Sequence, residues 1–378
     1  MGRCEPHLAI ASQFMSKEKP APFQLFHLND DDAGLTLGTA IKKRMVAWSW
    51  GQTREAILKR KVQVNGNLCL DQARKVTAKD VVKLWNESLP KPVQPTAVKL
   101  AYVDDFLVVV EKPPGITSTR HFEERNLPKK RKQLQPTLEE LLPEALEKHF
   151  VSRSKVAEQE TSASRSFNKK TKGRLSAQDA ERQRAMRLKR FEVIAVHRLD
   201  RDTSGLMIFA RTPSIAKLLG LAFRKHEVTR KYHAVVHGHP QAQSFDSILV
   251  RDRGDGKRGT QPVDRTEDPT AQRAITHIRP MEKIGIYSMI ECTLETGRTH
   301  QIRIHLSEAG HLLCGDPIYN KAASGDRTDD QSGAPRQALH SATLEFEHPI
   351  SGDKMTFRMP WPADLHHWLK GLREKETK

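Results

Sequence analysis

One charged stretch lies between two apolar segments and decides how the fold is interpreted: Val196-His197-Arg198-Leu199-Asp200-Arg201-Asp202-Thr203-Ser204-Gly205-Leu206. Residues 191–196 before it and residues 206–210 after it are short and apolar, which predicts two buried strands. The charged stretch is therefore expected to be a tight loop on a rigid support, where proteins commonly hold catalytic groups. An aspartate in a loop rich in Gly, Ser and Thr more often caps a turn or pairs with a neighbouring Arg. Position alone therefore leaves both interpretations of Asp200 open.

The charge of the whole chain favours a polyanionic partner. Its 378 residues, of which 37% are hydrophobic, allow two or three domains with cores of modest size. Lys and Arg number 63 against 46 Asp and Glu, a formal net charge of +17, and neutralising phosphates with such charges releases counterions. No apolar run approaches the ~20 residues of a membrane-spanning helix, and the N-terminus has no signal-peptide pattern. We therefore expect a cytoplasmic protein that binds no membrane.

The cysteines and histidines have no metal-ligand pattern. The four cysteines are far apart and form no C-x-x-C pair, and they are Cys4, Cys69, Cys292 and Cys314. The 17 histidines include no H-E-x-x-H, and His300 and His305 are too far apart to share one helical face. We expect reduced thiols and no metal.

Residues 23–87 are predicted to form a small α/β unit. Its predicted elements are helices at 37–43 and 52–61, a strand at 62–67 that ends in an Asn-Gly turn, and a strand at 76–85. A basic helix followed by V-x-V-N-G resembles the S-four-like RNA-binding module of a ribosomal small-subunit protein. The resemblance implies an RNA-binding domain, although any small α/β unit with a hairpin has the same pattern.

Residues 98–365 are predicted to form a second, larger domain, which begins after a proline-rich spacer at 88–98. Predicted strands lie at 98–103, 106–111, 231–238 and 287–295, and a predicted helix lies at 215–226. Many strands with interspersed helices, without regular βαβ alternation, argue for an α+β domain with a mostly antiparallel, mixed sheet.

Residues 151–190 differ in composition from the rest of the chain. They hold twelve Lys and Arg, four Asp and Glu, and the single aromatic Phe167. Such a segment is too polar to offset the entropy of its own ordering. The composition predicts a basic, largely disordered insertion that ends in a helix over 176–190. We expect this insertion to bind RNA without sequence preference. A merely solvated linker is the alternative.

Three separated motifs together resemble the RluA-type pseudouridine synthases, a family that modifies uridine in RNA. The motifs are Y-x-D-D-x-L-x-V-x-x-K-P-x-G at 102–115, H-R-L-D-x-x-T-S-G at 197–205 and T-G-R-x-H-Q-I-R-x-H at 296–305. The similarity covers roughly 98–361, apart from the insertion and from 116–120, which lacks the family's His-Pro. It implies that the larger domain has the pseudouridine synthase fold.

The resemblance implies a site of three residues. Asp200 would be the nucleophile or base, Arg303 its salt-bridge partner, and Tyr232 the ring that stacks on the uracil. Pseudouridine formation detaches the base, rotates it and rejoins it through a ring carbon, so no cofactor is expected. An arginine offers a planar fork to orient the carboxylate. Alone, such a tyrosine is more often a core residue and such an arginine a helix-surface cation, but their joint presence favours the functional interpretation.

A uridine stacked in a helix or loop must be extruded to reach Asp200. The resemblance implies that Arg198 fills the space left by the flipped base, where its guanidinium plane can stack. Arg298 and Gln301 are candidates to bind substrate phosphate or to hold the loop itself. His197 is expected to be structural.

The sequence therefore predicts an RNA pseudouridine synthase, an isomerase, which we expect to be a monomer. Ribosomal RNA is favoured because the resemblance links an S-four-like module with such substrates, and transfer RNA is the near alternative. A non-catalytic RNA-binding protein of ribosome assembly is a different class of explanation. Such a protein has no need to hold Asp200, Tyr232 and Arg303 together. A nuclease would need a carboxylate cluster for metal ions, which the sequence lacks.

Overall fold

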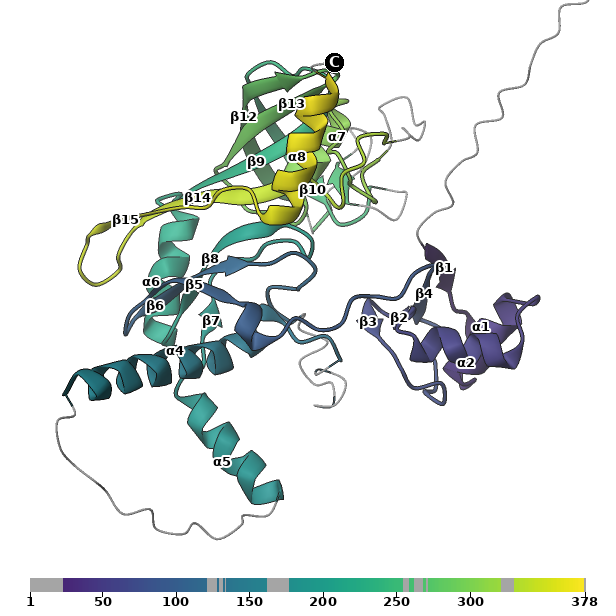
Figure 1. Ribbon diagram of the computed structural model, residues 1–378. Coiled ribbons are helices and arrows are strands. Elements are labelled where there is room, and N and C mark those ends of the chain that lie inside the picture. Colours follow the sequence, from purple (N-terminus) through teal and green to yellow (C-terminus); the bar gives the residue numbers. More distant parts are fainter. Residues whose placement is uncertain are drawn as a thin grey trace, which may run out of the picture. The chain divides into compact units, whose positions relative to one another are not determined.

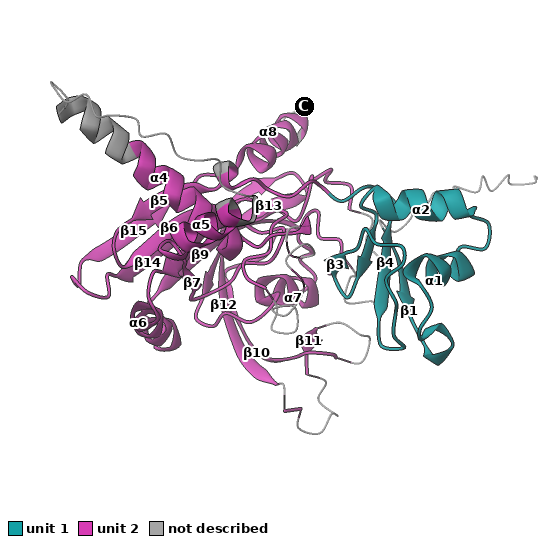
Figure 2. Ribbon diagram, turned by 90° about the horizontal axis from the view of Figure 1, so that it is seen from below, with its two compact units in different colours: residues 1–89 teal, residues 90–378 magenta. Residues whose placement is uncertain are grey.

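The computed structural model describes residues 23–120, 128, 132, 134–161, 177–253, 258–261, 268–269, 271–320 and 330–376. The chain divides into two compact units, Met1–Leu89 and Pro90–Lys378, which Figure 2 draws in different colours. The division falls inside the proline-rich stretch at 88–98, where the prolines lack the N–H that a helix or sheet would use.

The first unit is a four-stranded antiparallel sheet with two helices. Its strand order is β1-β4-β2-β3. The elements are β1 (Phe23–His27), the 3-10 helix η1 (Asp30–Asp32), α1 (Leu37–Arg44), α2 (Trp50–Leu58), β2 (Val62–Val64), β3 (Asn67–Leu68) and β4 (Val81–Trp85). Apolar side chains from the helices and the sheet form its core, among them Leu37, Ile41, Ile57, Val64 and Val82.

Local hydrogen bonds set two limits that the sequence pattern misplaced. The helix predicted at 52–61 begins earlier, because Ser49 accepts from the N–H of Gln52 at 3.1 Å and caps α2. The strand predicted at 76–85 begins only at Val81, since Asp80 accepts from the N–H of Thr77 at 3.0 Å and closes a turn.

The second unit is built on one large, mostly antiparallel sheet (Figure 1). Its strand order is β11-β10-β12-β13-β9-β14-β8-β6-β5, with β15 paired to β14 and β7 to β8. Among the described strands, β14 and β8 pair in parallel and the other pairs are antiparallel. The predicted α+β class with a mixed sheet is confirmed. The strands are β5 (Lys99–Val103), β6 (Leu107–Lys112), β7 (Ile194–Ala195), β8 (Ser204–Ala210), β9 (Thr229–His237), β10 (Gln243–Val250), β11 (Gly259–Thr260), β12 (Gln272–Ile284), β13 (Tyr287–Leu294), β14 (Leu339–Glu347) and β15 (Lys354–Arg358).

Six helices within the described residues accompany this sheet. They are η2 (Pro95–Ala97), α4 (Leu138–Thr161), α5 (Ala177–Lys189), α6 (Pro213–Arg224), α7 (Gln301–Glu308) and α8 (Ala363–Glu376). Of these, α4, α6, α7 and α8 pack on the sheet through apolar side chains. Leu138 and Leu142 of α4 share a core with Val110 of β6 and Phe209 of β8. The C-terminal helix α8 lies against β9 and β13 (Figure 1), and the sequence interpretation did not foresee it. No helix among the described residues is long and apolar enough to cross a membrane.

Within the basic insertion at 151–190, the structure contains the helix predicted over 176–190, and it also continues a preceding helix that was not predicted. α4 continues as a helix to Thr161, α5 covers Ala177–Lys189, and residues 162–176 lie outside the described part. Two ion pairs join α5 to α4, Arg184 with Glu144 at 2.5 Å and Arg187 with Glu147 at 3.0 Å. The charge that made the segment look unable to order thus partly serves contacts between helices.

Candidate active site

A buried lysine, Lys112, holds the loop that carries Asp200 through hydrogen bonds to the loop backbone. Lys112, at the end of β6, is fully buried, and its Nζ donates to the carbonyl oxygens of Pro113 (3.1 Å), Arg201 (2.9 Å) and Thr203 (2.8 Å). Burial lowers the pKa of Lys112 to about 7, against the raising effect of the neighbouring aspartates. Two carbonyls of the catalytic loop are therefore fixed to the end of a central strand.

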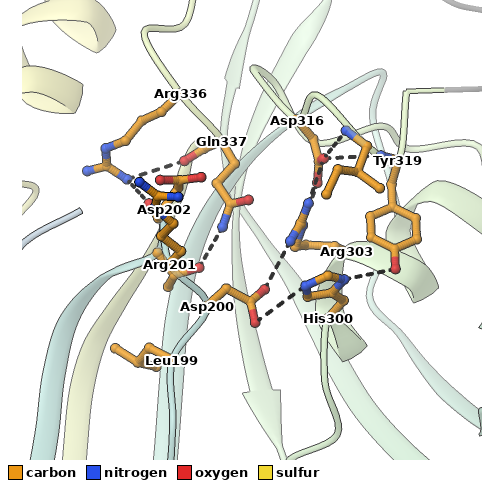
Figure 3. A network of polar contacts seen from close by, with 12 residues as sticks. Leu199, Asp200, Arg201, Asp202, His300, Arg303, Asp316, Tyr319, Arg336 and Gln337 are labelled. Carbon is orange, nitrogen blue, oxygen red and sulfur yellow. Dashed lines mark hydrogen bonds and ion pairs between the residues drawn. The ribbon is translucent and has the colours of Figure 1, made fainter. Parts of the chain in front are cut away.

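Close backbone contact fixes the far end of the same loop. Gly205 has φ +124°, and a Cβ there would lie 2.3 Å from the backbone oxygen of Ser341 on β14. This approach allows β8 and β14 to pair in parallel directly after the loop. Gln337 Nε2 also donates to Thr203 Oγ1 at 2.7 Å, and Arg336 Nη1 to Asp202 O at 2.9 Å (Figure 3). The loop is held on both sides, which makes the position of Asp200 well defined.

Asp200 faces an arginine that is itself held by a second aspartate (Figure 3). Arg303 of α7 donates from Nη1 to Asp200 Oδ2 at 3.2 Å. Its Nε and Nη2 donate to Asp316 Oδ2 at 2.6 Å and Oδ1 at 2.8 Å, a two-pronged pair that is buried. Asp200 and Arg303 are therefore in contact, as the family resemblance implied. Asp316 orients the guanidinium group of Arg303 toward Asp200.

Electrostatics keep Arg303 and Asp316 charged. Burial opposes the charge on Arg303, but the hydrogen bonds and charge of Asp316, with a further contribution from Asp200, hold its pKa above the ordinary value. Burial likewise opposes ionisation of Asp316, but Arg303 and two backbone N–H groups keep its pKa below the usual range. A permanently charged cation therefore lies beside the Asp200 carboxylate.

Two more side chains border the Asp200 carboxylate, and the sequence interpretation gave them no role. His300 Nε2 lies 4.0 Å from Asp200 Oδ1, and His300 Nδ1 is hydrogen-bonded to the hydroxyl of Tyr319 at 2.9 Å. Burial lowers the pKa of His300, although Asp200 raises it, so the neutral ring is favoured. The ring of Tyr319 lies 5.0 Å from the guanidinium of Arg303. His300 falls in the motif at 296–305, and this was the available signal, whereas Tyr319 lies outside the three motifs.

All of the residues that the sequence singled out line one cavity of about 590 Å³. They are Arg198, Asp200, Tyr232, Arg298, Gln301 and Arg303. Tyr232, on β9, is buried beside Leu294 of the same cavity, and burial raises the pKa of its hydroxyl. Arg198 and Arg298 are exposed, and Arg298 Nε donates to the carbonyl of Arg273 at 3.1 Å. The assignment of catalytic roles to these residues stays a prediction.

Gln301 is the one predicted substrate-binding residue whose polar atoms are fully used inside the protein. Its Oε1 accepts from Thr296 Oγ1 (2.8 Å) and from the N–H of Arg298 (2.9 Å). Its Nε2 donates to Ile275 O and to Thr276 Oγ1, both at 2.9 Å. Gln301 is also buried. Of the two roles expected for Gln301, these contacts favour holding the turn between β13 and α7, and a role in binding substrate stays a prediction.

His197 has the structural role expected of it. Its Nε2 accepts from the N–H of Ile208 at 2.9 Å, and its ring stacks on Phe223 with centroids 4.8 Å apart. Burial lowers the pKa of His197 to about 3, so the ring is neutral and can accept this bond.

One group of potential metal ligands occurs within the described residues, and it lies outside the Asp200 cavity. It consists of His237, Cys314 and Asp330, whose ligand atoms lie within 4.8 Å of one another. Asp330 is hydrogen-bonded to His237 Nε2 at 3.0 Å and to the N–H of Gly315 at 2.5 Å, and burial raises the pKa of the Cys314 thiol. These atoms are engaged within the protein, and the expectation of no metal stays a prediction.

Comparisons with known proteins point to one family. The model of a family described as RNA pseudouridylate synthase matches residues 106–308. The ribosomal large subunit pseudouridine synthase D of Zymomonas mobilis is 42% identical over 179 residues, which are 47% of this chain and 55% of that protein. The protein of the same name from Vibrio cholerae is 28% identical over 362 residues, 92% of this chain and 94% of that protein.

The extent of these matches differs. The aligned part spans about half the length of several curated relatives, as for Zymomonas mobilis. A solved structure of human RNA pseudouridylate synthase domain containing 4 is 20% identical, with a TM-score of 0.49, and covers 73% of this chain and 93% of that chain. The family match begins at residue 106, so it does not bear on the first unit.

Proposed function

This chain belongs to the RNA pseudouridylate synthase family, and on that premise we propose that it converts specific uridines of ribosomal RNA to pseudouridine at Asp200. The observation that carries the proposal is the Asp200–Arg303–Asp316 triad, of which Asp200 and Arg303 line the same cavity as Tyr232. The triad supplies an oriented carboxylate and a fixed cation, the two groups that the reaction requires.

The reaction can be followed through the residues of the site. The bond between the ribose C1′ and the uracil N1 breaks, the freed base rotates, and a bond forms between C1′ and C5. The C5 proton is then lost and a proton is taken up at N1, so the product is an isomer of the substrate. Asp200 acts as nucleophile toward the sugar or as base toward a proton, and Arg303 keeps the carboxylate aimed. Tyr232 offers a ring on which the freed base stays stacked.

The target base must leave its stack before this chemistry begins. Arg198 is exposed at the cavity wall two residues before Asp200, so it can reach the RNA while Asp200 holds the flipped nucleotide. We assign it the place that the flipped base vacates, where a guanidinium plane can stack.

Two lines support ribosomal RNA as substrate. Several relatives are named for ribosomal large subunit pseudouridine synthesis. The first unit contains the two helices and the hairpin that the sequence predicted for residues 23–87, and we propose that it is an S-four-like RNA-binding module. We propose that this unit adds affinity for RNA, and that the protein acts in the cytoplasm as a monomer.

A direct test compares RNA substrates. Purified protein is incubated with large-subunit ribosomal RNA or transfer RNA transcripts labelled with tritium at C5 of uridine, and released tritium is measured. Release from ribosomal RNA, at one or a few mapped uridines, is expected. Release from transfer RNA alone would favour that substrate instead, and binding without release from either RNA would favour a non-catalytic assembly protein.

A further inference from the structure

A second hollow, rich in arginine, adjoins the Asp200 cavity. It has a volume of about 490 Å³ and shares Arg198, Arg298 and Thr299 with that cavity. Its further lining residues include Arg251, Arg258 and Gln272. No acidic residue occurs among the described residues that line it. The hollow therefore concentrates positive charge next to the place where the target uridine would bind.

Nearby acidic side chains are engaged with other arginines. Asp316 pairs with Arg303, and Glu308 pairs with Arg253 at 3.4 Å. Within the part of the chain that the structure describes, Arg258 and Arg298 form no ion pair. Burial lowers the pKa of Arg258, and the charges of Arg251 and Arg198 lower it further, against the raising effect of Tyr319 and Asp200. This mutual repulsion would be relieved by an anion between the guanidinium groups.

The position of Arg258 is tied to the catalytic helix. Arg258 directly precedes β11, whose Gly259 and Thr260 pair with the end of β10. Glu308, the last residue of α7, accepts from the N–H of Thr260 at 2.9 Å and from its hydroxyl at 2.5 Å. The same helix carries Arg303. An anion bound by Arg258 would therefore be held at a fixed place relative to Asp200.

Gly259 lies in contact with a side chain of α7. A Cβ at position 259 would lie 2.4 Å from Cδ of Arg253 and 3.0 Å from Glu308 Oε1. Both are flexible side chains, so the contact places the backbone next to Arg258 beside Glu308 without requiring a glycine there.

We propose that Arg258 and Arg298 bind a phosphate of the RNA backbone next to the target uridine, and thereby fix the register of the RNA at the Asp200 cavity. The inference rests on the proposed function for the nature of the ligand. A backbone phosphate fits because it is an anion with several acceptor oxygens, which guanidinium groups bind in two-pronged geometry. The contact carries no sequence information and fixes register. Both arginines are positioning residues, whereas Asp200 performs the chemistry.

The first test measures binding to a large-subunit ribosomal RNA transcript in an Asp200→Asn background, so that turnover does not interfere. Adding Arg258→Gln or Arg298→Gln should flatten the plot of log Kd against log salt by about one unit of slope each, because one phosphate contact is lost. Arg358→Gln is the matched control, since Arg358 is an exposed arginine on β15 outside both hollows. A slope for Arg258→Gln equal to that of Arg358→Gln would overturn the proposal.

A kinetic readout separates positioning from a structural defect. In an otherwise unmodified protein, Arg258→Gln should raise KM for the transcript about tenfold, while kcat at saturating RNA stays near that of the parent protein. Arg258→Lys keeps the charge and should restore part of the affinity. A fall in kcat with unchanged KM would contradict a role in binding phosphate.

The sharpest test replaces single phosphates. Once the target uridine is mapped, synthetic stem-loops carry an uncharged methylphosphonate at the phosphate on its 5′ or 3′ side. One replacement should weaken binding to the parent protein about tenfold and weaken binding to Arg258→Gln much less, which demonstrates coupling. If each replacement weakens RNA binding equally in the parent protein and in Arg258→Gln, the phosphate contact is overturned. Tritium release by the parent protein would then still support the proposed function. Absence of tritium release would instead overturn the proposed function.

Discussion

Removing the charge of Asp316 should damage both stability and catalysis. In Asp316→Asn the Arg303 guanidinium loses the carboxylate that holds it at 2.6 and 2.8 Å, and this pair is buried on both sides. Removing one partner of a buried pair costs about 3–5 kcal/mol. Asp200 still offsets part of the Arg303 charge and an Asn oxygen still accepts one bond, so we expect about 3 kcal/mol of lost unfolding free energy.

A matched control is available in an exposed pair of the same geometry. Glu282 and Arg373 also make two hydrogen bonds, at 2.8 and 2.5 Å. Their side chains, however, are 34% and 42% exposed. Exposed pairs contribute about 0–1 kcal/mol. Glu282→Gln should therefore change the free energy of unfolding by less than about 1 kcal/mol and leave tritium release unaffected.

The assays are urea denaturation followed by circular dichroism, and single-turnover tritium release with RNA in excess. Asp316→Asn should lower the rate of release by up to about 100-fold, because Arg303 then holds Asp200 less firmly. RNA binding should change little. If Asp316→Asn matches Glu282→Gln in stability and retains the parent rate, the triad does not position Asp200 and the reasoning fails.

The remaining predictions concern the supports of the loop and the basic insertion. Gly205→Ala should lower the unfolding free energy by more than about 2 kcal/mol in thermal denaturation, because its Cβ would collide with the Ser341 backbone; a variant as stable as the parent would contradict this contact. Lys112 has a folded-state pKa of about 7 against 10.5 unperturbed, so the unfolded chain holds its proton more tightly between these values. Parent stability should therefore rise from pH 7 toward pH 10 relative to Lys112→Met, by up to about 5 kcal/mol, and parallel pH curves for the two proteins would refute the shift. Replacing 151–190 by a short Gly/Ser linker should weaken RNA binding and flatten its salt dependence without abolishing turnover at saturating RNA; an unchanged salt slope would reduce the segment to a linker.

The sequence anticipated the parts of the site that lie within motifs. The loop around Asp200 was predictable because apolar strands flank it, and the family motifs linked it with Arg303, 103 positions away. The orienting role of Asp316 was not predictable, since an aspartate after a glycine has no periodic pattern and its partner is set by the tertiary fold. The sequence left open whether Gln301 binds substrate or holds the loop, because its sequence context does not reveal that four groups already occupy its amide.

α8 was missed although its pattern was readable: Leu365, Leu369 and Leu372 lie on its buried face with an i, i+4, i+7 spacing. α5 was predicted at 176–190, but its contact with α4 was not. α5 carries few apolar residues, and its contact with α4 is made by ion pairs such as Arg184 with Glu144. From composition alone such charges are expected to be solvated. The partners of the α5 arginines lie about 40 residues earlier in the chain, on α4, so the local sequence does not reveal the contact.

The most direct test of the central claim is tritium release from C5-labelled ribosomal RNA by Asp200→Asn. Asp105→Asn serves as the control, because Asp105 is an almost fully exposed aspartate in the turn between β5 and β6. Asp200→Asn should release no tritium while binding the same RNA with nearly the parent affinity, and Asp105→Asn should match the parent in both. Release at the parent rate by Asp200→Asn would contradict the assignment of the chemistry to this residue.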